Sequence, residues 1–168
     1  DMVAQCIKNQ VKFNHILADS WFSSKENMEF VLEQKKHFIF AMKSNRTIAV
    51  SKEDKRQGKF QQVSNVMQEQ YQPILAHIKG LKKPVLVIKQ VFTNEDGSTG
   101  ILYLVTSDLT LTYESLTTLY QKRWKVELYH KSLKQNASLS KSPTCTVTTQ
   151  TNHFFAALYA FVKLEMLK

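Results

Sequence analysis

Apolar positions in the first forty residues alternate between helical spacing and short continuous runs. Residues 2–11 are apolar at 2, 3, 6, 7 and 11, which is the spacing of one helical face. An apolar run over 13–18 stops at Asp19 and predicts a buried strand that ends at an acid. Residues 23–35 predict a helix with a serine N-cap, and 37–42 predict a second strand. Strand, helix and strand in close succession are typical of an α/β layer.

The middle of the chain reads as β structure. Residues 85–92 and 99–106 are rich in β-branched and aromatic side chains, and the turn sequence 93–98 between them contains Asp-Gly. This pattern predicts a β-hairpin. Residues 73–78 offer a further strand. We therefore expect a β-rich insertion over 44–110, inside an α/β frame.

A long helix is predicted from Thr112 to about Gln135, and it has two distinct faces. Four polar side chains fall at offsets 0, 3, 7 and 14, which return to one side of a helix: Tyr120, Arg123, Glu127 and Lys134. An apolar stripe beside them is expected to face a core: Leu116, Leu119, Val126, Tyr129 and Leu133. The helix therefore presents one carboxylate in a row of groups suited to phosphate.

The last part of the chain predicts a loop and a closing helix. Residues 136–149 are rich in Ser and Thr, and 151–168 have amphipathic spacing. The chain contains no internal repeat and no long linker. We expect one domain in three parts: a core segment over 1–43, the insertion over 44–110, and the two helices over 111–168.

Composition and charge limit the classes of protein to which this chain can belong. Hydrophobic residues are 43% and charged residues 22%, as in globular proteins. No apolar run approaches the roughly 18–20 residues that span a bilayer. Net charge is +9, and residues 111–168 carry eight basic and three acidic side chains. This basic excess is typical of a protein that binds a polyanion such as nucleic acid, but from charge alone a solubilising surface is an equally good explanation. Cys6 and Cys145 fit reduced thiols of a cytosolic protein.

Asp19 and Glu127 are the candidate metal ligands. Mg²⁺ takes oxygen ligands, and two such ions can activate the attacking oxygen and stabilise the leaving oxygen of a phosphodiester. Each acid has an alternative reading from its local sequence. Glu127 can pair with Arg123 or Lys131 at helical spacing, and Asp19 can be a turn residue after a strand.

The candidate DNA contacts lie on the same predicted helix as Glu127: Tyr120, Arg123, Trp124, His130, Lys131 and Lys134. Arg123 can grip a phosphate with two parallel hydrogen bonds, whereas Lys134 acts as a point charge. For Trp124, stacking on DNA and packing in a core are the two alternatives. Surface or packing roles remain the default for the histidines.

These residues resemble a known family. The spacing Tyr120-x2-Arg123-x3-Glu127-x6-Lys134 is similar to the Tyr-Arg-Glu-Lys signature of bacterial insertion-sequence transposases, specifically the insertion-sequence-four family. Residues 17–22, Leu-Ala-Asp-Ser-Trp-Phe, resemble the segment around the second catalytic aspartate of that family, and residues 105–109 are also similar. The resemblance covers nearly the whole chain and favours the metal-site reading of both acids.

The resemblance implies a fold and a reaction. The fold would be a ribonuclease H-like α/β core with a β-rich insertion before the helix that carries Glu127. The site would hold Mg²⁺, or Mn²⁺ as the alternative ion, with Asp19 and Glu127 among three acids. Water would nick double-stranded DNA at a transposon end, and the freed 3′-hydroxyl would attack a second phosphodiester. The enzyme would act as a homodimer in the bacterial cytoplasm, with Tyr120, Arg123 and Lys134 on DNA phosphates.

Two features depart from the family pattern. The first catalytic Asp of the family lies on an earlier strand, and Asp1 is in the wrong place to supply it. We therefore expect an incomplete core that lacks its first strands and cannot cleave DNA alone. Some relatives stack a base on a Trp of the insertion, but here the tryptophans lie outside it, which leaves Phe92 or Tyr103 as substitutes.

Two other functions remain open from the sequence. One is a non-catalytic DNA-binding module from a truncated element, which would use only the basic helix. The other is a general nuclease on the ribonuclease H-like fold.

Overall fold

The computed structural model describes residues 2–66, 72–94, 96–139, 141–142 and 145–167. The chain forms two compact units, one up to Tyr120 and one from Gln121 onward.

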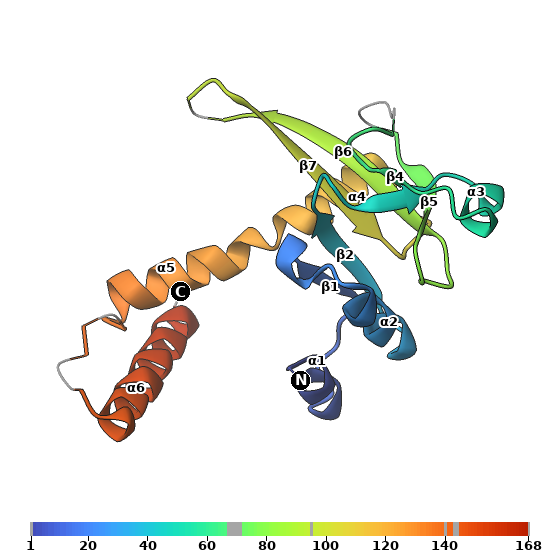
Figure 1. Ribbon diagram of the computed structural model, residues 1–168. Helices are drawn as coiled ribbons and strands as arrows, with labels where there is room; N and C mark the ends of the chain where they lie inside the picture. Colours follow the sequence, from blue (N-terminus) through green and yellow to red (C-terminus); the bar gives the residue numbers. More distant parts are fainter. Residues whose placement is uncertain (1, 67–71, 95, 140, 143–144, 168) are drawn as a thin grey trace. The chain divides into compact units, whose positions relative to one another are not determined.

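The first unit holds a sheet and its helices (Figure 1). Its elements are α1 (Met2–Lys8), β1 (His15–Ala18), the short 3₁₀ helix η1 (Ser20–Phe22), α2 (Lys25–Glu33), β2 (His37–Met42), β3 (Thr47–Ala49), α3 (Lys52–Arg56), β4 (Gln61–Gln62), β5 (Ile74–Ile78), β6 (Val85–Thr93), β7 (Thr99–Thr106) and α4 (Tyr113–Gln121). The strands and helices predicted up to residue 106 are confirmed, with small shifts at their ends.

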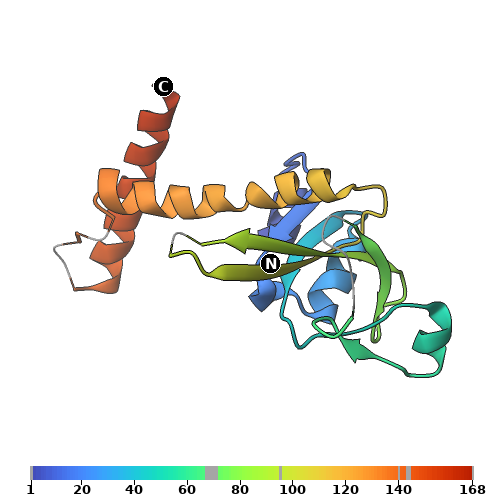
Figure 2. The same cartoon turned by 90° about the horizontal axis from the view of Figure 1, so that it is seen from above.

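Seven strands of the described residues form one sheet in the order β1-β2-β7-β6-β5-β3-β4. β1 and β2 are parallel, with His15 opposite His37, and every other neighbouring pair is antiparallel. The β6–β7 hairpin extends beyond the other strands (Figures 1 and 2). Because β7 pairs with β2, the strands within 44–110 continue the sheet of the first segment. The expected α/β class is confirmed.

Local sequence explains the ends of these elements. The hydroxyl of Ser24 accepts from the Asn27 N–H at 3.2 Å and caps α2, as its sequence predicts. The hairpin turn uses Gly97 at a φ of 81°, a left-handed conformation that costs glycine little. Farther along the hairpin, the Phe92 ring lies over Gly100 and leaves no room for a Cβ there. These two glycines therefore set the turn and the packing of the hairpin.

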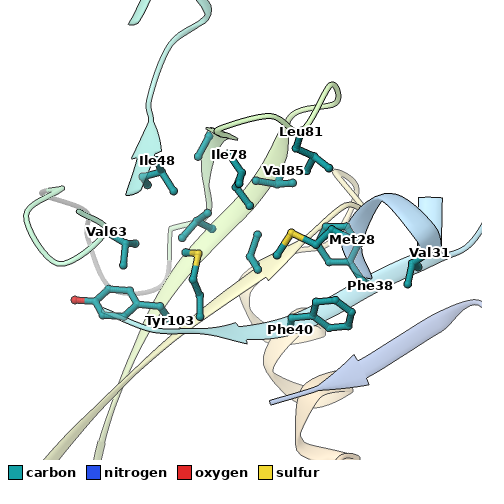
Figure 3. Packing of buried hydrophobic residues seen from close by; sticks show 14 residues of the cluster. Met28, Val31, Phe38, Phe40, Ile48, Val63, Ile78, Leu81, Val85 and Tyr103 are labelled. Atoms are coloured by element: carbon teal, nitrogen blue, oxygen red, sulfur yellow. The ribbon is translucent and has the colours of Figure 1, made fainter. Parts of the chain in front are cut away.

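Both faces of β2 are buried, which places the sheet between two layers of side chains. Phe38 and Phe40 belong to one apolar cluster, which includes Met28 and Val31 of α2 (Figure 3). The intervening residues of β2 belong to a second cluster with side chains of α4: Ile39, Ala41, Tyr113, Leu116 and Tyr120. Alternating side chains point to opposite faces of a strand, so α2 and α4 cover opposite faces of the sheet.

The second unit is a pair of helices, α5 (Trp124–Asn136) and α6 (Val147–Met166). Tyr129 and Phe161 pack edge to face with ring centroids 5.1 Å apart, and Leu133 and Ala157 are buried. Thr146 caps α6 through the Thr149 N–H, so this helix begins before the predicted start at 151.

The predicted single helix over 112–135 is wrong. It is divided between α4 and α5, because the N–H groups of Lys125 and Val126 bond to carbonyls three residues back instead of four. Neither proline nor glycine marks this break in the sequence. The predicted apolar stripe is divided as well: Leu116 lies in the sheet unit, Leu133 is buried in the helical pair, and Val126 is exposed.

Replacing Phe38 tests the core between α2 and the sheet. This side chain is fully buried, so Phe38→Ala is expected to lower the free energy of unfolding by about 3–5 kcal/mol through lost burial and a new cavity. Urea unfolding followed by circular dichroism measures the change. The exposed Val50→Ala variant is the control, expected within about 0.5 kcal/mol of wild type. Equal stability of the two variants would contradict the assigned core.

Candidate active site

Asp19 lies directly after β1 and caps η1. Its Oδ1 accepts from the backbone N–H of Trp21 at 2.9 Å. The side chain is exposed, and no donor from the described residues reaches Oδ2. The alternative reading of Asp19 as a turn residue describes this cap correctly, but the cap uses only one of the two carboxylate oxygens. The other oxygen is available to a cation.

Glu127 lies on a polar face of α5. Five side chains fall within an arc of about 100° on this helix at 100° per residue: Arg123, Glu127, His130, Lys131 and Lys134. Tyr129 and Leu133, which pack in the helical pair, lie outside that arc. The helix with one apolar and one cationic face is therefore confirmed for the part of the chain after the break.

The Glu127 carboxylate forms an ion pair with Arg123. The guanidinium Nη2 donates to Glu127 Oε1 at 2.8 Å, and the side chains are 23% and 44% exposed. The alternative that Glu127 forms an ion pair on its own helix is therefore confirmed for Arg123. Among the described residues, Glu127 forms no ion pair with Lys131. An exposed pair at this spacing contributes only about 0.3–0.5 kcal/mol, so a stronger partner can replace it.

Tyr120 does not share the face of α5. Its residue is 8% exposed and its ring belongs to the apolar cluster beneath α4. The predicted row of four groups on one helix therefore breaks at its first member, because α4 ends at Gln121. Phosphate binding by Tyr120 stays a prediction that rests on the family signature alone.

Trp124 and Lys134 are both exposed. The guanidinium of Arg123 lies 5.9 Å from the centroid of the Trp124 ring, and Trp124 is 59% exposed. Core packing within the helical pair does not account for Trp124. Lys131 and His130 are exposed beside them. This face offers cations and an aromatic ring to a polyanion.

Sequence analysis missed two cations near Asp19. Lys43 and Arg46 follow β2, the strand parallel to β1, and line a hollow of about 220 Å³ together with Trp21. The carboxyl ends of parallel strands lie at the same edge of a sheet, which brings these residues to the side of Asp19. The one available signal was the basic sequence that follows the second predicted strand.

The opposite end of the parallel strands holds a second polar cluster. Asp108 Oδ2 accepts from His15 Nε2 at 3.0 Å, and the His15 ring stacks on His37 with centroids 5.5 Å apart. Burial by itself raises the pKa of Asp108, but hydrogen bonds from Thr110 and His15 and the charge of His37 outweigh burial and lower it. His15 begins β1 and Asp19 follows its end, so roughly 10 Å or more of strand separates Asp108 from Asp19.

The carboxylates suit a hard divalent cation. Asp19 and Glu127 each retain one oxygen without a donor from the described residues, and both are exposed. They belong to different units. No group of three or more His, Cys, Asp or Glu side chains within the described ranges is arranged to hold a metal.

A sheet buried between helices, with an acid at the end of a strand and another on a cationic helix, is compatible with the ribonuclease H-like fold of DDE transposases. The family model of the transposase DDE domain matches residues 1–162. The chain therefore belongs to that family, whose members are enzymes of the polynucleotidyl-transferase type that act on DNA and generally use divalent metal ions. No curated protein matches the chain. Among the described residues, no helix has the length and apolar character needed to cross a bilayer.

The Asp108–His15 contact has a pH-dependent consequence. Asp108→Asn is expected to lower the free energy of unfolding at neutral pH by on the order of 1 kcal/mol, because a hydrogen bond to a charged acceptor is weakened. A lowered pKa in the folded state stabilises the protein above the ordinary pKa of Asp, and this contribution is lost as pH falls through the lowered value.

Urea unfolding between about pH 7 and about pH 2 measures this difference, which should shrink toward the acid end. Glu33→Gln, which neutralises an exposed carboxylate on α2, is the control and should follow wild type throughout. A difference between Asp108→Asn and wild type that is independent of pH would contradict the assignment.

Proposed function

We propose that this chain is part of the catalytic domain of an insertion-sequence-four transposase, in which Asp19 and Glu127 supply two of three metal ligands. The observation that carries the proposal is the position of Asp19. It is an exposed carboxylate directly after β1, the strand that runs parallel to β2, in a chain whose residues 1–162 match the transposase DDE domain. Carboxylates at such strand ends are suited to holding a cation against a phosphodiester.

Asp19 and Glu127 would hold Mg²⁺, with Mn²⁺ as the alternative ion. The bound ions would supply Lewis-acid stabilisation of the attacking and leaving oxygens. The exposed carboxylate oxygens described above support this role, as does the weak ion pair that holds Glu127. Union of the two acids in one site is part of the proposal, since they belong to different units.

The cationic face of α5 would bind DNA phosphates. Arg123 presents a planar guanidinium that matches phosphate geometry, and Lys134 adds an exposed charge on the same face. Lys131 and His130 lie between them. Because this row also carries Glu127, phosphate binding there would bring the substrate to the acid.

The site requires a third acid. Asp108 does not fit, because it bonds to His15 at the other end of β1. β1 is the edge strand of the sheet, with a neighbour on one side only among the described strands. A further strand carrying the third acid would pair at that free edge, and residues 1–168 alone would then lack one ligand and not cleave DNA.

In the complete protein, these residues would cut and rejoin transposon-end DNA in the bacterial cytoplasm. A homodimer would hold the paired ends together. Family membership supports the cutting and rejoining of DNA.

Neutralising Glu127 tests the metal site. Glu127→Gln in the complete transposase is expected to reduce Mg²⁺-dependent strand transfer by more than about a hundredfold, since loss of even an outer-shell partner costs a metal site about 10–100-fold. Affinity for transposon-end DNA should stay equal or rise, because one negative charge near the phosphates is removed. Strand transfer measured on gels and affinity measured by fluorescence anisotropy separate the two effects.

Glu114→Gln is the matched control, because Glu114 is an exposed acid in the first turn of α4, outside the proposed site. It should retain full strand transfer. Full activity of Glu127→Gln would refute the assignment of Glu127 as a metal ligand.

Lys134 tests the DNA-binding face. Lys134→Ala is expected to weaken binding to all DNA sequences and to reduce the slope of log K against log salt by about one. Lys125→Ala removes the same charge from the opposite side of α5, nine residues and about 180° away, and should change the slope less. Salt titrations measure both slopes. Equal slopes for Lys134→Ala and wild type would remove Lys134 from the phosphate contacts.

A non-catalytic DNA-binding module is the second candidate. The Arg123–Glu127 ion pair favours it, because it gives Glu127 a structural role without any metal. The two candidates differ in one result. In a binding module, Glu127→Gln would change DNA affinity alone, and Mg²⁺ would have no effect on any activity.

A further inference from the structure

Trp21 is the most exposed large aromatic side chain beside the candidate acid. It lies on η1, two residues after Asp19, and is 79% exposed. A tryptophan usually contributes a large buried area to a folded protein, so this exposure forgoes much hydrophobic stabilisation.

The backbone around Trp21 is held firmly. Asp19 Oδ1 accepts from the Trp21 N–H at 2.9 Å, and Asn27 Nδ2 donates to the Phe22 carbonyl at 2.9 Å. Ser23, at the end of η1, is buried. The indole is therefore presented from a fixed turn and not from a loose loop.

Two cations line the hollow beside the indole. Lys43 Nζ lies 5.6 Å from the centroid of the Trp21 ring, within the range of a cation–π contact. Lys43 and Arg46 line the 220 Å³ hollow beside the ring, together with Asn45 and Ser24.

The hollow continues along the sheet. A second hollow of about 480 Å³ shares Ser20, Lys43 and Asn45 with the first and extends to Tyr103 on β7. Both are lined by residues of the first unit only. We call these two adjoining hollows, beside the carboxyl ends of β1 and β2, the groove. Trp21 and Arg46 line its first part, and Lys43 lines both parts.

We infer that this groove binds a single-stranded stretch of DNA, with one base stacked on Trp21 and the adjoining phosphate held by Lys43 and Arg46. An aromatic platform next to a cationic groove is how proteins bind unpaired nucleotides without reading their sequence. With most of the indole exposed, Lys43 covers at most one face of the ring, and the other face is open to a base.

The inference rests on the proposed function and makes it more specific. Trp21 is two residues from Asp19, so the stacked nucleotide would lie next to the phosphodiester that the acid acts on. The substrate at this point would be an unpaired nucleotide at a DNA end and not a continuous duplex. The positive charge of the groove favours DNA over a peptide as the occupant.

The other aromatic residues of this unit are less suited. Tyr103 is 6% exposed and belongs to the core, so the prediction that it could take over base stacking is not supported. Phe92 is partly exposed, but its ring lies over Gly100 on the hairpin. Neither has a cation beside it among the cation–π contacts of the described residues.

Tryptophan fluorescence provides a direct test on the full chain. The two tryptophans are Trp21 and Trp124, so Trp124→Phe leaves Trp21 as the single reporter. A twelve-nucleotide single strand, a blunt duplex of the same sequence, and free thymidine monophosphate serve as probes. The single strand is expected to quench Trp21 fluorescence with saturation, whatever its sequence, and the blunt duplex to quench it weakly.

Variants measured by anisotropy with the same probes separate stacking from charge. Trp21→Ala is expected to weaken binding of the single strand about 5- to 150-fold, the equivalent of ~1–3 kcal/mol for one stacked base. Affinity for the blunt duplex should change less than about twofold, and Trp21→Phe should restore most of the loss because it keeps a ring. Lys43→Ala should reduce the salt slope for the single strand by about 0.7.

Several results would overturn the inference: absence of quenching, equal affinity of Trp21→Ala and wild type for the single strand, or equal affinity of wild type for thymidine monophosphate and the single strand. The last result would identify a free-nucleotide site. An unchanged Trp21→Ala together with loss of strand transfer in Glu127→Gln would refute this groove and leave the proposed function standing. The converse pair of results would support the groove and refute the metal-site assignment.

Discussion

The parallel pairing of β1 with β2 determines which polar side chains meet in this protein. In two parallel strands, the first residues lie side by side at one end of the pair, and the last residues lie side by side at the other end. At the starts, His15 stacks on His37 and bonds to Asp108. At the ends lie Asp19 and Lys43. The starts of the two strands therefore carry a hydrogen-bonded cluster of an acid and two histidines, whereas their ends carry an exposed acid beside cations.

The register of that pairing is maintained by burial on both faces of β2. A shift of one residue would exchange Phe38 and Phe40 with Ile39 and Ala41, and would move every side chain of the strand to the wrong layer. The neighbouring strand β1 follows the same pattern, with Ile16 and Ala18 on one cluster and Leu17 on the other. The core therefore fixes where Asp19 emerges from the sheet, although Asp19 itself is exposed.

Local signals made much of the fold predictable. Three elements follow from residues that are close together in the sequence, and all three are present in the structure. They are the helix capped by Ser24, the strand over 37–42 and the hairpin around Gly97. The break between α4 and α5 was not predictable, because no helix-breaking residue marks it and it consists of a change in backbone hydrogen bonding at Lys125 and Val126. The contact of His15 with Asp108 spans 93 residues, and the approach of Lys43 to Trp21 depends on strand pairing. Contacts between residues so far apart in the sequence depend on the order and direction of the strands in the sheet. The spacing of apolar residues along the chain does not determine that order.

A strand at the edge of a sheet has hydrogen-bonding neighbours on one flank only, and its terminal residues fray most readily. In β1 the first residue is fastened by a side-chain bond to Asp108, which follows β7, a strand beyond its direct neighbour β2. The four residues of β1 are therefore held both by their backbone pairing with β2 and by the side-chain bond from His15 to Asp108. This bond at the start of β1 therefore helps to hold in position the other end of the strand, where Asp19 lies.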